Sequence, residues 1–247
     1  NNGKLTFYPG SGAETFKVAT NSTATLAALQ TIIKRLKLLP EKYISAEKQH
    51  HYDSLLKRTP SISFTSFNGH TTIAPAKSWE RVNNEESPQL YTVFPWRMYG
   101  VGKPGLDTAI NTWRYDTLVQ KFKSHVGWKQ DNIWAARLGL VEDAWHYNKL
   151  KMQNSGRRFP AFWGPGFDWV PDHNWGGSGM IGMQEMLLQT DGKRILLFPA
   201  WPKDKEVHFK LHAPYNTTVE AELRDGRVVL LKVMPEERKE DVELFIK

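Results

Sequence analysis

The stretch FPAFWGPGFDWVPDHNWGGSG, residues 159–179, places aromatic rings, prolines and glycines around two carboxylates, Asp168 and Asp172. Proline removes backbone donors and glycine adds conformational freedom, so an ordinary helix or strand does not tolerate this mixture. We therefore predict an ordered loop. Flat aromatic faces beside carboxylates are what the apolar face of a sugar ring and a glycosidic bond require. On composition alone, the alternative is a structural loop that caps a core.

The bulk composition is that of a globular protein without disulfides. The chain has 247 residues and ten tryptophans, with 40% hydrophobic and 24% charged residues and no cysteine. The net charge is +7, but Lys and Arg are dispersed among Asp and Glu, so we expect no nucleic-acid partner. No apolar run approaches the roughly 18 residues of a membrane span, so we expect no membrane partner. His50 and His51 have no third ligand at metal spacing, and we expect neither a metal nor a cofactor.

The first third of the chain indicates extended structure, two helices and a loop. Residues 1–20 are punctuated by Gly and Pro and are predicted to be extended. A helix is expected to begin at Asn21-Ser22-Thr23, any of which can cap it, and to stop at Pro40. A weaker helix fits residues 41–57, and residues 60–87 are predicted to be a long loop.

Apolar spacing predicts helices again in the middle of the chain and strands at its end. The predicted helices lie at 88–98, 105–120, 128–139, 142–152 and after 177. From about residue 193 the apolar residues alternate, and Asp225-Gly226 predicts a hairpin turn. We therefore predict a helical domain, residues 1–192, followed by a small antiparallel β domain, residues 193–247.

Three segments carry a resemblance to a known family: GWKQDNIWAARLGLVEDAW (127–145), DHNWGGSGMIGMQEMLLQ (172–189) and LLFPAWP (196–202). Together they resemble the C-terminal half of the catalytic region of glycoside hydrolase family 95, which comprises inverting α-L-fucosidases and their relatives. The resemblance implies a mainly α fold, part of an (α/α)6 toroid, followed by a β-sandwich-like domain. About seven helical patterns are present where a toroid has twelve, so we expect the N-terminal half of the toroid to be missing.

The resemblance assigns two catalytic carboxylates. Asp172 falls on the family's catalytic-base aspartate, in an Asp-x-Asn-aromatic-Gly-Gly pattern with His173 in place of Gly and Trp175 in place of Phe. Glu14, in YPGSGAETFK (8–17), falls on the general-acid glutamate, although Ala13 stands where the family has Pro. The family's His-Arg-His-Leu segment is replaced by residues 87–91, SPQLY, which bears on the identity of the sugar.

Further residues are candidates for binding an oligosaccharide. They are Trp79, Glu80, Trp163, Asp168, Trp169, His173, Asn174 and Trp175. The tryptophans have core packing as the plainer alternative, and Glu80 has an ion pair with Arg81. By composition alone, Asp168 is also the main rival of Asp172 as the catalytic base. Asp172 itself has the alternative of capping the helix that follows it.

The expected function is hydrolysis of a fucoside or related glycoside, with a periplasmic or secreted location. Two alternatives stay open. One is a non-catalytic module that binds sugars or serves a structural role. The other is a different (α/α)6 enzyme such as a lyase or phosphorylase, although no cluster of Lys, Ser and Gly near Asp172 suits a phosphate.

Overall fold

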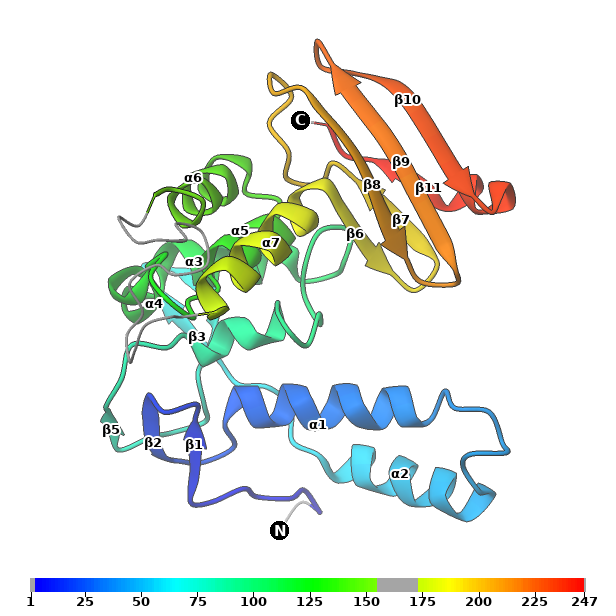
Figure 1. Cartoon of the computed structure of the whole chain (residues 1–247). Coiled ribbons are helices and arrows are strands. Elements are labelled where there is room, and N and C mark those ends of the chain that lie inside the picture. Colours follow the sequence, from blue (N-terminus) through cyan, green and yellow to red (C-terminus); the bar gives the residue numbers. More distant parts are fainter. Residues whose placement is uncertain (1–2, 155–172, 247) are drawn as a thin grey trace. The chain divides into compact units, whose positions relative to one another are not determined.

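The computed structural model describes residues 3–154 and 173–246, and these form a mixed α/β structure (Figure 1). Helices account for 38% of the described residues and strands for 23%, in four small sheets. The prediction of a mainly α toroid is therefore wrong. The physical reason is that, besides the strands predicted after residue 193, short strands form between residues 10 and 82, where the sequence shows no periodic pattern. The chain divides into two units, Asn1–Lys123 and Ser124–Lys247.

The first unit contains two small sheets. One is three-stranded in the order β1-β2-β5, and the other is the hairpin β3-β4. Their strands are β1 (Gly10–Gly12), β2 (Phe16–Ala19), β3 (Phe64–Phe67), β4 (His70–Ile73) and β5 (Arg81–Val82). The segment 60–87 was predicted as a loop, but Asn68 and Gly69, with φ of 50° and 80°, make the tight turn of the β3-β4 hairpin.

The helices of the first unit are α1 (Thr23–Leu36), α2 (Ala46–Arg58), η1 (Pro88–Thr92), α3 (Leu106–Tyr115) and α4 (Thr117–Phe122). The two predicted N-terminal helices are confirmed, with shorter bounds. The predicted side-chain cap of α1 is not formed. Ser22 makes no capping hydrogen bond, whereas the Thr23 hydroxyl donates to the Ala74 carbonyl oxygen at 2.6 Å. The first residue of helix α1 is therefore held by a hydrogen bond to Ala74, 51 positions later in the chain, rather than by a side-chain cap.

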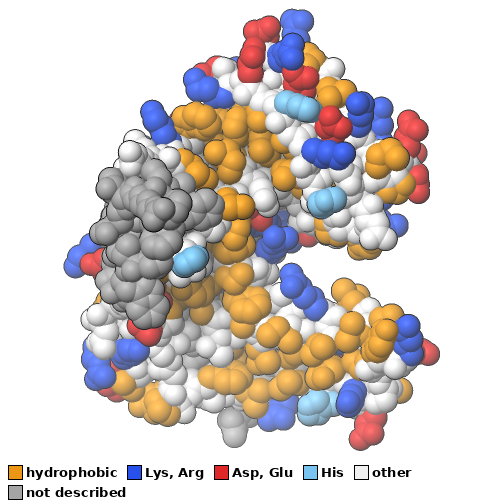
Figure 2. All heavy atoms as spheres, in the orientation of Figure 1, with side chains coloured by type: hydrophobic (Ala, Val, Ile, Leu, Met, Phe, Trp, Pro, Cys, Tyr) orange, Lys and Arg blue, Asp and Glu red, His pale blue; other side chains and the backbone are white. Residues whose placement is uncertain are grey.

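Hydrophobic side chains lie on both the inner and the outer side of α1. Leu26, Ala27 and Ile33 are buried, while Ile32 and the following Leu39 are exposed. In Figure 2 hydrophobic atoms form a row in the region that α1 and α2 occupy in Figure 1. The buried side packs on η1, where Leu90 is fully buried.

The second unit begins with three helices, α5 (Asp131–Arg137), α6 (Val141–Lys151) and α7 (His173–Leu187). Each of the three packs on the other two. The first two confirm the helices predicted at 128–139 and 142–152. The described part of helix α7 includes His173, four residues before Gly177, so the helix extends further toward the N-terminus than predicted and contains the glycines.

Two three-stranded sheets follow, in the orders β11-β7-β6 and β10-β9-β8. Their elements are β6 (Leu188–Asp191), β7 (Arg194–Leu197), β8 (Val207–Ala213), β9 (Thr217–Arg224), β10 (Arg227–Met234), η2 (Glu236–Asp241) and β11 (Val242–Leu244). The Asp225-Gly226 hairpin turn is confirmed, because it joins β9 to β10. One strand departs from the predicted antiparallel arrangement: β11 pairs with β7 in parallel.

The predicted division into domains at residue 192 stays a prediction. Gly192 lies in the turn between β6 and β7, within one antiparallel pair of strands.

Among the described residues, no helix has the length and apolar character needed to cross a membrane.

Candidate functional site

The predicted acid, Glu14, lies in the tight turn that joins β1 to β2. The backbone N–H of Thr15 donates to the carbonyl oxygen of Gly12 at 3.2 Å, and Ala13 adopts a left-handed conformation with φ of 51°. In residues other than glycine, this left-handed conformation causes steric strain between the Cβ and the backbone. The Glu14 side chain is exposed at the tip of the turn.

A second carboxylate, that of Glu86, holds this turn. Its Oε2 accepts hydrogen bonds from the Glu14 backbone N–H at 2.6 Å and from the Thr15 hydroxyl at 3.0 Å. The backbone N–H of Glu86 in turn donates to Thr15 Oγ1 at 2.9 Å. We call these three bonds the Glu86 clamp. The neighbouring Asn84 donates from Nδ2 to Glu14 Oε2 at 3.4 Å.

Sequence reasoning missed Glu86 because it assigned residues 60–87 to a loop. A signal was present nonetheless: Glu85 and Glu86 are adjacent carboxylates in a segment that already held Trp79 and Glu80 as candidates. Once β5 pairs with β2, in the register Phe16 to Val82, this segment runs back beside the Glu14 turn.

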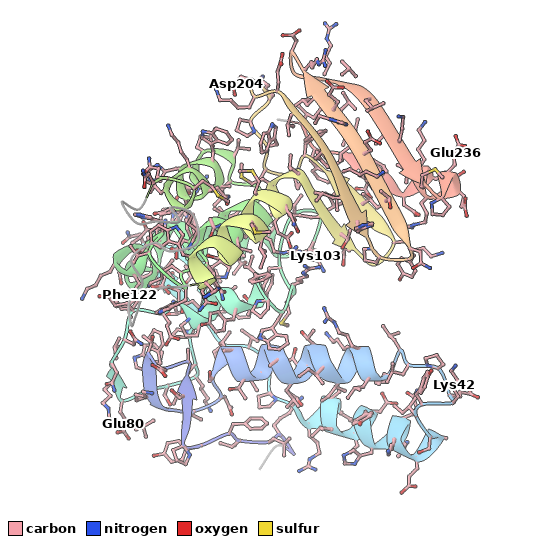
Figure 3. The ribbon with its side chains drawn as sticks, viewed as in Figure 1. Lys42, Glu80, Lys103, Phe122, Asp204 and Glu236 are labelled. Atoms are coloured by element: carbon pink, nitrogen blue, oxygen red, sulfur yellow. The ribbon has the colours of Figure 1, made fainter. Side chains whose placement is uncertain are left out.

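The same pairing brings Trp79 and Glu80 to the sheet that carries Glu14. The Glu80 backbone N–H donates to the Lys17 carbonyl oxygen at 3.1 Å, and the Trp79 ring meets the Phe16 ring edge-on with centroids 5.2 Å apart. Trp79 is 38% exposed, so part of its indole faces solvent. Figure 3 labels Glu80 beside this sheet. Three predicted site residues of the first unit are thus joined in one local structure.

The charge of Glu86 affects the pKa of Tyr91, which lies in η1. Burial raises the pKa of the Tyr91 hydroxyl to about 12, and the negative charge of Glu86 adds to the increase. A raised tyrosine pKa stabilises the fold below pH 10, where the unfolded tyrosine is also neutral. This contribution is lost as the pH rises from about 10 to about 12.

We expect Glu86→Gln to lower the pKa of Tyr91 from about 12 while leaving it above its ordinary value of 10.0, because burial is the larger cause. The measurement is a tyrosine titration followed by absorbance or by NMR of labelled rings. Tyr147, whose pKa is raised to about 12 by burial and by Asp131 and Asp143, serves as an internal reference. An unchanged Tyr91 titration would contradict the proximity of the two groups.

The predicted base, Asp172, lies outside the described residues, as do Trp163, Asp168 and Trp169. The described structure resumes at the next residue, His173, which begins α7. Because Glu14 and α7 belong to different units, the predicted convergence of Glu14 and Asp172 stays a prediction.

The first turn of α7 presents polar side chains and is anchored by a buried tryptophan. His173 and Asn174 are exposed. Trp175 is only 3% exposed, and its indole N–H donates to the Lys151 carbonyl oxygen at 2.7 Å. This contact makes Trp175 an anchor between α7 and the end of α6, the plainer of its two predicted roles.

His125 lies against the same tryptophan. The two rings meet edge-on with centroids 5.6 Å apart. Burial, followed by the positive charges of Lys151 and His146, lowers the pKa of His125 below its ordinary value. A neutral imidazole therefore lies beside the first turn of α7 at neutral pH, where it is able both to donate and to accept hydrogen bonds.

Helix α7 is held by a buried amide network. Asn132 of α5 donates from Nδ2 to Asn148 Oδ1 at 3.0 Å and to the Ser178 carbonyl oxygen at 2.8 Å. Both asparagines are fully buried. They lie so close to α7 that a Cβ at Gly182 would meet Asn132 Nδ2 at 2.1 Å. A glycine at position 182 is thus required for the close approach of α7 to α5 and α6.

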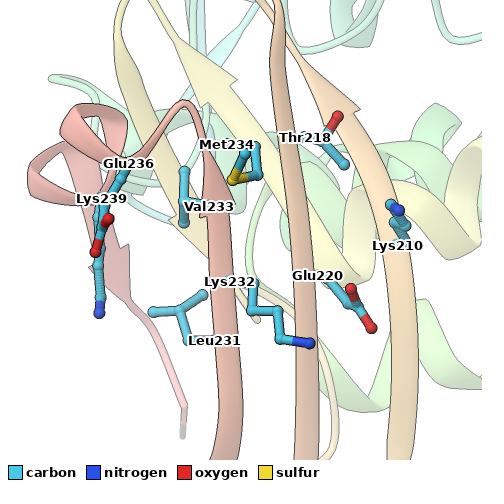
Figure 4. A pocket seen from close by; sticks show the side chains of 9 residues that line it. All are labelled: Lys210, Thr218, Glu220, Leu231, Lys232, Val233, Met234, Glu236 and Lys239. Atoms are coloured by element: carbon cyan, nitrogen blue, oxygen red, sulfur yellow. The ribbon is translucent and has the colours of Figure 1, made fainter.

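One pocket lies elsewhere, on the sheet β10-β9-β8. It has a cavity volume of about 360 Å³. Figure 4 shows its lining residues: Lys210, Thr218, Glu220, Leu231, Lys232, Val233, Met234, Glu236 and Lys239. None is a predicted site residue, and no aromatic ring is among them. The pocket therefore does not provide the aromatic faces that a sugar site uses.

Among residues 3–154 and 173–246, no three His, Asp or Glu side chains gather as metal ligands would. Comparisons of the chain with protein-family models and with curated proteins found no match.

Proposed function

We propose that this chain is a glycoside hydrolase that cleaves a fucoside or related glycoside with inversion, with Glu14 as general acid and Asp172 as general base. The observation that carries the proposal is the Glu14 turn. Glu14 is exposed, yet its backbone is held by the Glu86 clamp and its carboxyl accepts a hydrogen bond from Asn84. Most exposed glutamates have no such fixed position, so we infer that the order of this one serves a function. The family resemblance of residues 172–189 supplies the second carboxylate.

The chemistry needs two carboxyl groups with different protonation. A protonated Glu14 would give its proton to the glycosidic oxygen as the bond to the anomeric carbon breaks. The Asp172 carboxylate would take a proton from water as the water oxygen attacks that carbon from the opposite face. Inverting enzymes hold the two groups about 6.5–9.5 Å apart to admit the water. His173 and Asn174, both exposed at the start of α7, would bind sugar hydroxyls.

In a turnover assay with aryl α-L-fucosides, we expect Asp172→Asn to lower kcat/KM by about 10²–10⁴-fold, because it removes the general base. Asp168→Asn is the matched control and is expected to leave hydrolysis largely intact. Equal losses in the two variants would refute the assignment of the base.

The acid is tested by Glu14→Gln with two leaving groups. Loss of the proton donor should matter most for a poor leaving group such as an alkyl alcohol, and least for a dinitrophenolate, which departs without protonation. A loss independent of the leaving group would count against Glu14 as the acid. Because the resemblance implies that the N-terminal half of the toroid is missing, inactivity of this chain alone is compatible with the proposal. Absence of turnover of any glycoside both by this chain and by a longer version that includes the missing half would count against the whole proposal.

A second candidate function is a non-catalytic sugar-binding module. It is favoured by the partly exposed Trp79 ring beside Glu80, which resembles a sugar-binding surface rather than a reaction centre. Calorimetry would detect binding of oligosaccharides without release of reducing sugar, and Trp79→Ala would abolish that binding. An oligosaccharide partner is common to both candidates, and a periplasmic or secreted location would suit either.

A further inference from the structure

The Glu86 clamp joins two segments that are far apart in the sequence. Glu86 lies 72 positions beyond Glu14 and 71 beyond Thr15. Two of its three bonds have the carboxylate as acceptor, and charge-assisted hydrogen bonds are about twice as strong as neutral ones. Thr15 is fully buried, so its share of the clamp is shielded from water. Competition from solvent is therefore weak on that side of the turn.

The clamp acts on the backbone of Glu14 and leaves its carboxyl, which accepts from Asn84 Nδ2 at 3.4 Å, exposed to a ligand. The bond from Glu86 ends on the Glu14 N–H, while the Glu14 side chain is exposed. The turn needs such support because Ala13 is left-handed, a conformation that costs a residue with a Cβ about 1–2 kcal/mol. Without the clamp, the hairpin tip would sample other conformations and carry the carboxyl with it.

We infer that Glu86 is a positioning residue, which holds Glu14 in the one backbone conformation that presents its carboxyl to the glycosidic oxygen. The role of Glu86 in catalysis rests on the proposed function. Its ordering of the Glu14 turn is independent of that function. Glu86 acts through Glu14 and does not itself touch substrate. A positional error of about 1 Å at a reacting group costs on the order of 10²-fold in rate.

The experiment uses the full chain with Glu86→Ala, Glu86→Gln and the control Glu85→Gln, which removes the adjacent charge. Amide NMR and hydrogen exchange report on the Glu14 N–H, and kcat and KM are measured on an alkyl fucoside, whose leaving group needs protonation by the general acid. In Glu86→Ala we expect the Glu14 amide resonance to move upfield and to exchange on the order of tenfold faster. We also expect kcat to fall on the order of 10²-fold with KM nearly unchanged.

The Glu86→Gln variant distinguishes a positioning role of Glu86 from a general loss of stability. Glu86→Gln keeps an oxygen acceptor for the Glu14 N–H, so it should restore most of the amide shift and of kcat, and Glu85→Gln should change neither. An unperturbed Glu14 amide in Glu86→Ala would overturn the inference whatever the activity. A perturbed amide, with no turnover of a glycoside either by this chain or by a longer version that includes the missing half, would support the ordering of the turn and would refute the proposed hydrolase instead.

Discussion

Replacing Arg137 by methionine is expected to lower the free energy of unfolding of the second unit by about 3–5 kcal/mol. Arg137 Nη1 lies 2.7 Å from Glu185 Oε2, and the two side chains are only 2% and 8% exposed. Removing the guanidinium leaves a carboxylate in a low-dielectric interior without its countercharge. The loss is therefore the cost of a stranded charge rather than the value of one contact.

The double variant Arg137→Met/Glu185→Leu tests that explanation. It removes both charges and replaces them with apolar groups, so it should recover most of the stability lost in the single variant. Arg194→Met is the control, because Arg194 and Glu243 form a two-point pair of which each side chain is about two-fifths exposed. Its cost should stay below about 1 kcal/mol. Urea unfolding followed by tryptophan fluorescence measures all three variants, and a double variant as unstable as the single one would contradict the explanation.

Gly182→Ala is expected to destabilise the second unit by about 3 kcal/mol, although alanine favours a helix. The new methyl carbon would lie 2.1 Å from Asn132 Nδ2 and 2.5 Å from Asn148 Oδ1, inside their mutual hydrogen bond. Overpacking a tight core costs about 1–3 kcal/mol. Breaking the buried amide bond leaves polar groups unsatisfied, at a further 1–3 kcal/mol or so.

Gly177→Ala is the matched control in the same helix. A Cβ at Gly177 would meet no atom of the described residues within 4 Å, so the substitution should stabilise α7 by about 0.5–1 kcal/mol through backbone entropy. Thermal unfolding of the two variants should therefore shift in opposite directions. Shifts of the same sign would show that the glycines of α7 are chosen for something other than helix packing.

The sequence identified several candidate residues of the site, but it did not predict how they are arranged in space. The family resemblance assigned Glu14, and the end of the predicted loop offered Trp79 and Glu80 as separate candidates. The structure joins them through the pairing of β2 with β5. No periodicity predicted this pairing, because β5 has only two residues, Arg81 and Val82. The Glu86 clamp went unpredicted for the same reason.

Trp175 shows a second limit of the sequence. Its position in an aromatic, glycine-rich segment is compatible with either a sugar-stacking role or core packing. Its indole N–H is used by a carbonyl oxygen 24 positions earlier, that of Lys151. An amphipathic side chain such as tryptophan suits a cleft or a core equally well by composition. Only the packing of α7 against α6 distinguishes the two.

The sequence by itself determined the local elements. Alternation at Val219, Ala221 and Leu223 specified a strand with one fully buried face, and Asp225-Gly226 specified the turn that follows it. Tertiary structure decided the mixed α/β class, the parallel β11-β7 pair and the Glu86 clamp. The reason is that helix period, strand alternation and turn chemistry are written within a few consecutive residues. Pairings across some fifty to seventy positions depend instead on which distant backbone groups remain to be satisfied once those elements have formed.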